Sequence, residues 1–169
     1  MKRSLVGTIC FATLLLSAAA VALAEGRHDS ACSIRSVKGA WGYSESGTLY
    51  HPTAGAIPYA SVGSYTVDHH GNLSGARNAS AAGAIQFATV KGTATVNPDC
   101  TGELHLSLYD KSNNLLNTVV KFVVYVDNST AAWSIITDVV LPDGTTHVPA
   151  VLVTDAKKQF PDRVGDHEW

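Results

Sequence analysis

The sequence predicts an all-β fold, an antiparallel up-and-down barrel of eight or nine strands with a short N-terminal helical turn. From Trp41 onward, β-forming runs alternate with Gly, Asn, Asp and Pro at intervals of about 8–14 residues, and no stretch keeps a helical period over three turns. The connections between these runs are short. They must therefore join antiparallel neighbours, because a parallel crossover needs a dozen or more residues. A meander of eight strands removes its exposed edges by closing into a barrel. A two-sheet sandwich is the alternative.

The N-terminal segment has the composition of an export signal. Two basic residues precede an apolar stretch over residues 5–23, which ends in an Ala-Leu-Ala cleavage pattern. We therefore expect residues 1–24 to be a signal peptide and residues 25–169 to form a single β-barrel domain. The product would be secreted or periplasmic. No later stretch reaches the roughly 18 apolar residues of a membrane-spanning helix.

Charge and motifs exclude several functional classes. Without Lys2 and Arg3, ten basic residues stand against fourteen acidic ones, a net charge of −4. This excludes nucleic-acid binding through phosphate neutralisation and argues against binding to an anionic membrane. The chain carries no phosphate-binding loop, dinucleotide fingerprint, His-Glu-x-x-His or Gly-x-Ser-x-Gly motif. We expect no metal and no cofactor.

The cysteines favour a structural bridge. Cys10 falls within the expected signal, so Cys32 and Cys100 form the only remaining pair. In an oxidising compartment we expect them to form a disulfide. A reactive thiol or a metal pair would need a Cys-x-x-Cys spacing or a histidine at ligand spacing, and neither is present.

The elements follow in order along the chain. A helical turn is expected within residues 29–37, with Asp29 or Ser30 as its N-cap. Gly92 either divides two strands or forms a bulge inside one, which leaves the strand count at eight or nine. The polar residues 157–169 are expected to form a tail. The predicted β-runs are 40–50, 59–67, 72–78, 84–91, 92–96, 102–109, 116–126, 131–140 and 148–156.

The first predicted strand places Trp41, Tyr43 and Glu45 on one face, followed by Gly47 and Leu49. A single carboxylate on an otherwise apolar face is unusual. If this face points inward, Glu45 is removed from water, which is a condition that suits a general acid or base or a ligand anchor. The alternative is a carboxylate at the barrel rim that is solvated or satisfied by neighbouring groups.

Two further groups of titratable residues have simpler interpretations. Glu103 and His105 share a face of their strand, while leucines occupy the opposite face. If the leucines point inward, this polar face is exposed; in the opposite case the pair has a spacing suited to acid and base chemistry. The adjacent His69 and His70 are expected to be solvated turn residues. Neighbouring residues of a strand point to opposite faces, so the two side chains are poorly placed to bind one metal ion together.

The strands at 116–126 and 131–140 are apolar on both faces, unlike a barrel wall that meets water. In the second of them, Trp133, Ile135, Thr137 and Val139 alternate with the residues of the other face. Either a second subunit covers part of the exterior, so that the protein is a homo-oligomer, or the surface carries an apolar patch.

Two short motifs resemble those of the lipocalins. The Gly39-Ala40-Trp41 segment at the start of the first strand resembles the Gly-x-Trp that opens lipocalin barrels, and Thr137-Asp138 resembles their Thr-Asp-Tyr turn. The resemblance implies that the indole of Trp41 closes the barrel floor. The family's arginine that covers this indole has no clear counterpart, since Lys157 and Lys158 follow the last strand and Arg163 lies further out.

The chain is more similar to small exported bacterial proteins that begin with a Cys-Ser-x-x-Ser-x-Lys-Gly-x-Trp/Tyr-Gly pattern and carry Val-Asn-Pro-Asp-Cys-Thr-Gly later. Here these motifs are residues 32–42 and 96–102. The resemblance implies a lipocalin-like, or calycin, barrel with the disulfide already expected. It implies no catalytic residue.

These observations favour an exported, non-catalytic barrel that binds one small apolar or amphipathic molecule, because an eight-stranded barrel is wide enough either for its own side chains or for one small ligand. Trp41, Tyr43 and Tyr65 are the expected ligand-binding residues. One alternative is a cyclase or isomerase resembling allene oxide cyclase, with Glu45 as the catalytic residue facing a cavity of at least about 300 Å³. The other is a structural or surface-interaction protein with a filled barrel.

Overall fold

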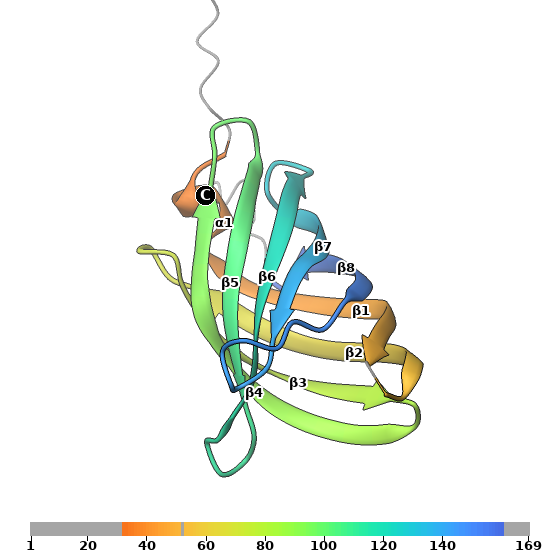
Figure 1. The fold of residues 1–169 in the computed structure, drawn as a ribbon. Coiled ribbons are helices and arrows are strands. Elements are labelled where there is room, and N and C mark those ends of the chain that lie inside the picture. The colour runs from red at the N-terminus through yellow and green to blue at the C-terminus, as the bar shows by residue number, and fades with distance from the viewer. Residues whose placement is uncertain (1–31, 52, 161–169) are drawn as a thin grey trace, which may run out of the picture.

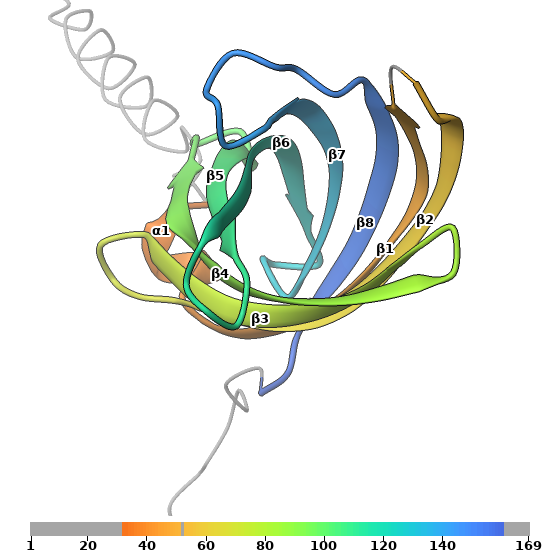
Figure 2. The ribbon, with the colours of Figure 1, turned by 60° about the horizontal axis from the view of Figure 1, so that its bottom comes forward.

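The computed structural model describes residues 32–51 and 53–160, and within them the chain forms a closed antiparallel barrel of eight strands (Figures 1 and 2). Each strand pairs with the next along the chain, and the last strand pairs with the first. The predicted up-and-down barrel is confirmed. The sandwich alternative is wrong, and the expected signal peptide lies outside the described residues. The elements are α1 (Ile34–Val37), β1 (Gly39–His51), β2 (Gly55–Val67), β3 (Asn72–Ala81), β4 (Ala84–Val96), β5 (Thr101–Tyr109), β6 (Leu115–Val126), β7 (Ala131–Val140) and β8 (Ala150–Lys158).

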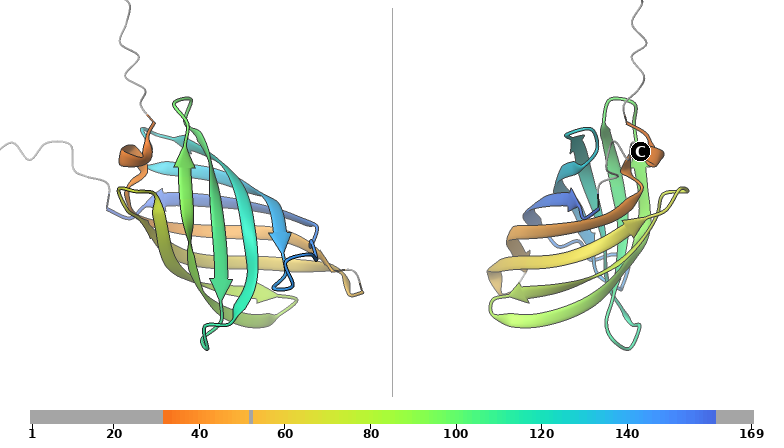
Figure 3. Two further views of the ribbon diagram at one scale, coloured as in Figure 1. Left: turned by 60° about the vertical axis from the view of Figure 1, so that its left-hand side comes forward. Right: turned by 180° about the vertical axis from the view of Figure 1, so that it is seen from behind.

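The two ends of the barrel differ. Figure 3 shows α1 at one end, beside the turns that join β2 to β3 and β4 to β5. The β1–β2 and β3–β4 hairpins and the loop between β7 and β8 lie at the opposite end. We call the first end the floor and the second the mouth.

Gly92 lies inside β4, so the count of nine strands is wrong within the described part of the chain. The register is continuous past it, with Gly92 opposite Leu73 on β3 and Leu106 on β5, so it is not a bulge. A Cβ at this position would lie 2.0 Å from the carbonyl oxygen of His105. The glycine therefore permits close approach of the neighbouring strand, and a strand can continue through it.

The predicted helical turn is confirmed, although it begins later than expected. Ser33 is the N-cap of α1, and Ser33 and Ser36 cap each other's backbone in a capping box. The N-cap of α1 is thus Ser33, and Asp29 and Ser30, the residues predicted for this role, lie outside the described residues. The side chain of Trp41 lies under this turn and donates a hydrogen bond from Nε1 to the carbonyl oxygen of Val37 at 2.8 Å.

The floor is closed by Trp41, which is 1% exposed. Its indole stacks on Tyr65 at a centroid distance of 6.3 Å and meets the ring of Tyr125 edge-on at 6.2 Å. The ammonium of Lys158 lies 5.9 Å from the indole centroid and donates to the carbonyl oxygen of Ser36 at 2.7 Å. Lys158 is thus the basic residue that covers Trp41. The sequence alone did not identify which basic residue takes this position.

The outer faces of β6, β7 and β8 carry the apolar surface expected from the sequence. Phe122 pairs with Ile135, and Ile135 pairs with Val153, which makes a row across three strands. Trp133 lies beside this row and is 57% exposed. A second subunit covering this face stays a prediction.

One predicted alternation in β7 is wrong beyond Ile136. The pairing with β6 shifts by one residue there, because Val120 faces Asp138 while Lys121 faces Ile136, which leaves Thr137 as an extra residue. The hydroxyl of Thr137 donates to the carbonyl oxygen of Val120 at 3.2 Å. After this bulge Val139 points inward and is buried.

Cys32 and Cys100 form the expected disulfide, which joins the segment before α1 to the turn between β4 and β5. The bridge spans 68 residues of the chain. It therefore ties the segment before α1 to a neighbouring turn at the floor end of the barrel.

We predict that replacing both cysteines by alanine lowers the free energy of unfolding by up to about 4 kcal/mol, because a long covalent loop restricts the unfolded chain. Urea denaturation of the oxidised protein with and without reductant measures this loss. The double variant serves as the control and should not respond to reductant. An unchanged midpoint for the reduced wild-type protein would contradict the prediction.

Candidate functional site

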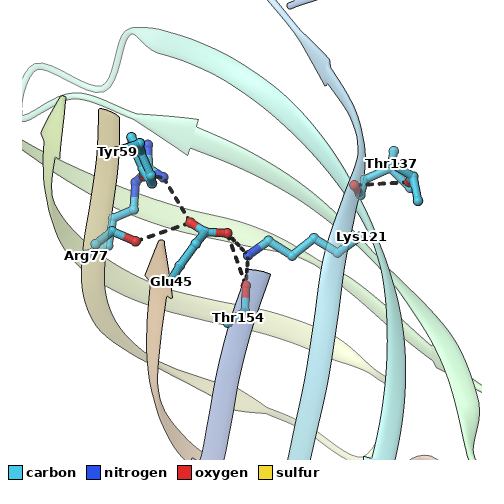
Figure 4. Close-up of polar contacts among 8 residues, drawn as sticks. Glu45, Tyr59, Arg77, Lys121, Thr137 and Thr154 are labelled. Carbon is cyan, nitrogen blue, oxygen red and sulfur yellow. Dashed lines mark hydrogen bonds and ion pairs between the residues drawn. The ribbon is translucent and has the colours of Figure 1, made fainter. Parts of the chain in front are cut away.

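A cluster of polar side chains lies in the middle of the lumen, with Glu45 at its centre (Figure 4). Glu45 points inward, as one of the two sequence interpretations proposed, and is 4% exposed. The register explains its nearest partners, since Ser61 on β2 and Thr154 on β8 are its direct cross-strand neighbours. The Ser61 hydroxyl donates to Glu45 Oε2 at 3.2 Å, and the Thr154 hydroxyl donates to Oε1 at 3.1 Å.

Lys121 reaches Glu45 from β6, across the barrel. Its ammonium donates to Glu45 Oε1 and, at 2.9 Å, to the Thr154 hydroxyl, and it lies 5.7 Å from the ring centroid of Tyr43. Burial lowers the pKa of Lys121, while the carboxylate of Glu45 acts in the opposite direction. The pair is a buried salt bridge whose remaining hydrogen-bonding positions are filled by hydroxyls, the arrangement that offsets the cost of removing two charges from water.

Arg77, on β3, is the second cation of the cluster and is 9% exposed. Its Nη1 lies 4.0 Å from Glu45 Oε2, beyond hydrogen-bond distance, and donates instead to the hydroxyl of Tyr59. The guanidinium lies 5.6 Å from the ring centroid of Tyr59. Burial raises the pKa of Tyr59, so this partner is a neutral phenol. Arg77 Nε has no hydrogen-bond partner among residues 32–51 and 53–160.

The cluster divides the lumen into two unequal parts. On the floor side lies a cavity of about 30 Å³, bordered by Tyr43, Tyr65 and Lys121 together with aliphatic residues. It has room for one or two water molecules, since each needs roughly 10–15 Å³. A space of about 20 Å³ surrounds Glu45 itself.

The larger cavity, of about 180 Å³, lies on the mouth side. Its position follows from its lining, because Leu49 and His51 end β1 and Ile57 lies near the start of β2. Most of the wall is aliphatic, and the polar groups that reach it come from Tyr59 and Arg77 and from a small number of rim residues. The full lining is Leu49, His51, Ile57, Tyr59, Arg77, Ala81, Gln86, Asn117, Val119, Ile136, Val139, Leu141, Val148 and Leu152.

The three residues predicted to bind a ligand thus lie on the floor side of the polar cluster. Tyr43 and Tyr65 border the small floor cavity, and Trp41 is sealed in the floor beneath it. Burial raises the pKa of both Tyr43 and Tyr65, so their hydroxyls stay protonated. None of these three borders the mouth cavity, which is the larger of the two parts of the lumen.

Glu45 does not face the volume that the cyclase hypothesis requires. That hypothesis needs at least about 300 Å³ beside the carboxylate, whereas the space at Glu45 measures about 20 Å³. Both carboxylate oxygens are engaged, Oε1 by Lys121 and Thr154 and Oε2 by Ser61. A catalytic role for Glu45 stays a prediction without geometric support.

The remaining titratable candidates lie outside the barrel. Leu104 and Leu108 are buried in the lumen, so Glu103 and His105 point to solvent and pair with each other at 3.1 Å. His69 and His70 are exposed in the β2–β3 turn, as expected. Within the described residues, no group of three potential metal ligands comes together, and no helix is long and apolar enough to cross a membrane.

Sequence reasoning did not identify Arg77, Lys121, Ser61, Thr154 or Tyr59 as site residues. The sequence did contain a signal for the two cations. Each is a charged residue in a series of alternate strand positions whose other members are small or apolar. Arg77 follows Leu73 and Gly75, and Lys121 stands between Val119 and Val123.

The described residues therefore define an antiparallel barrel with a closed floor, a charged layer across the lumen and an open mouth. No protein-family model and no curated protein matches the sequence. Among solved structures, the chain is similar to one described as "Structure of EF1p2_mFAP2b bound to DFHBI", at 12% identity with a TM-score of 0.48. The match covers 77% of this chain and 99% of that chain.

We predict that Glu45→Gln lowers the free energy of unfolding by about 3–5 kcal/mol, because it leaves the Lys121 and Arg77 charges buried without a carboxylate. Adding Lys121→Met should recover most of this loss, since it removes the unpaired ammonium. Urea denaturation of the two single variants and the double variant measures the coupling. Losses that simply add in the double variant would show that the two side chains do not stabilise each other.

We also predict a loss of stability above about pH 10 that depends on Tyr125. Burial raises the pKa of Tyr125 from 10.0 to about 12. The unfolded chain then loses the phenolic proton before the folded chain does, so the contribution is complete below pH 10 and falls as the pH rises toward 12, by on the order of 2 kcal/mol.

The measurement is the urea midpoint of the wild-type protein and of Tyr125→Phe at pH values of about 8, 10 and 11. The difference between them isolates Tyr125, since the other buried tyrosines are common to both proteins. The same decline in both proteins would contradict the assignment.

Proposed function

We propose that this protein is a non-catalytic barrel that binds one small apolar or amphipathic molecule in its mouth cavity. The observation that carries the proposal is a preformed space of about 180 Å³ with mostly aliphatic walls, at the end of the barrel opposite α1. An apolar protein cavity of about 150 Å³ binds benzene. The mouth therefore suits a molecule with roughly one ring, or a short chain.

Polar atoms at the mouth supply the points that would orient such a molecule. The side-chain oxygen of Asn117 and Nε of Arg77 are both buried and lack a hydrogen-bond partner among the described residues. Buried polar atoms are ordinarily paired. Arg77 and Asn117 both line the mouth cavity, so a ligand there would lie beside two side chains that keep an unpaired donor and an unpaired acceptor.

Export and barrel class belong to the same proposal. The signal-like segment over residues 1–24 supports a secreted or periplasmic protein. The motifs around Trp41 and Cys100 support a relationship to lipocalin-like exported barrels. The apolar face around Phe122, Trp133 and Val153 supports a homo-oligomer in which a second copy covers it.

We predict that toluene, benzyl alcohol and 3-phenylpropan-1-ol cause saturable amide shift changes in nuclear magnetic resonance spectra at mouth residues such as Leu49 and Val119. Floor residues such as Val67 should not respond, because the charged layer separates the two parts of the lumen. Ala81→Trp should abolish the response by placing an indole in the mouth.

The matched control is Val62→Trp, which adds the same side chain on the outer surface, where Val62 is 61% exposed. It should bind like the wild-type protein. Absence of saturable changes with all three compounds, or changes confined to the outer face, would overturn the proposed function.

A further inference from the structure

The guanidinium of Arg77 is a buried cation without a hydrogen-bonded counterion. Its contacts are the neutral phenol of Tyr59 and, at 4.0 Å, a carboxylate oxygen of Glu45. That carboxylate is already held by Lys121, Thr154 and Ser61. A buried charge is costly unless it is paired and hydrogen-bonded, and a hydrogen-bonded anion would offset this cost for Arg77.

The charge balance of the lumen also leaves Arg77 without a counterion of its own. Among the described residues the buried charged side chains are Glu45, Arg77 and Lys121, two cations and one anion. Lys121 makes the direct ion pair with the only carboxylate of this set. Buried charges are costly unless they are paired and hydrogen-bonded. The described interior thus carries a net positive charge, and Arg77 is the cation that is not hydrogen-bonded to the carboxylate.

An anionic ligand would reach Arg77 through the mouth, because Arg77 borders that cavity. No acidic side chain of the described residues lines it; besides Arg77, the titratable groups there are His51 and Tyr59. Glu45 lies behind Arg77 and does not border the mouth cavity. An incoming anion thus meets Arg77 first and is separated from Glu45 by the guanidinium.

On the basis of the proposed function, we propose that the ligand is a single-ring or short-chain carboxylate whose carboxylate group binds Arg77. The planar guanidinium matches a carboxylate in geometry and has free donors to offer it. The aliphatic wall then covers the hydrocarbon part, which fits a carboxylic acid of limited size better than a highly charged polar metabolite.

The test compares three molecules of nearly equal size that differ in one group: 3-phenylpropionate, 3-phenylpropan-1-ol and 3-phenylpropylamine. Isothermal titration calorimetry of the wild-type protein should show the carboxylate binding at least about tenfold more tightly than the alcohol, as expected for a charge-assisted hydrogen bond, with the amine weakest. Acetate, which carries the charged group without the ring, should not compete at equal concentration.

Variants assign the preference to Arg77. In Arg77→Met the carboxylate and the alcohol should bind within about twofold of each other, while alcohol binding persists. The matched control is Arg35→Met, which removes an exposed arginine of α1 at the floor end and should leave the preference unchanged. The comparison within the wild-type protein tests the proposal even if Arg77→Met fails to fold.

The outcomes separate the two proposals. If the alcohol binds the wild-type protein as tightly as the carboxylate, the carboxylate assignment is overturned and the proposed function stands. If acetate binds as tightly as 3-phenylpropionate, Arg77 is a general anion site and the ligand class is wrong. If none of the three compounds binds, the proposed function fails with it.

Discussion

A carboxylate in the middle of a β-barrel has to be paired, and the rest of the lumen is arranged around the pairing of Glu45. Its two cross-strand neighbours carry hydroxyls rather than apolar side chains, and a lysine extends from the far wall to meet it. The aromatic rings of Tyr43 and Tyr59 lie against the two cations. Apolar packing alone could not hold these charges, so the identity of each neighbour follows from Glu45.

This charged layer gives the two halves of the lumen different properties. Below it, aromatic residues and a helical turn seal the floor, and the remaining space admits little more than water. Above it, the walls are aliphatic and the space is several times larger. The layer thus forms the base of the mouth cavity, and Arg77 is the member of the layer that borders both the space around Glu45 and the mouth.

Strand periodicity was sufficient to predict the barrel and to place Trp41 and Glu45 on the same face of β1, because side chains alternate with a period of two. It did not decide whether that face points inward, and the structure shows that both residues are buried. It could not predict that Lys121 meets Glu45, since the two residues are 76 positions apart and their contact depends on how the four intervening strands are staggered. The bulge at Thr137 reversed the alternation in β7 for a similar reason: nothing local in the sequence marks an extra residue in a paired strand.

The seam between β1 and β8 has a consequence for how the barrel folds. Every other neighbouring pair of strands follows directly along the chain, whereas the seam joins residues such as Glu45 and Thr154, which are 109 positions apart. Contacts of such long range form slowly, because the chain must first lose much of its conformational freedom. Until the seam closes, β1 and β8 are open edges, and β8 presents Val151 and Val153 outward beside its unpaired backbone. The newly made chain is therefore most prone to aggregate just before the circle of strands is complete.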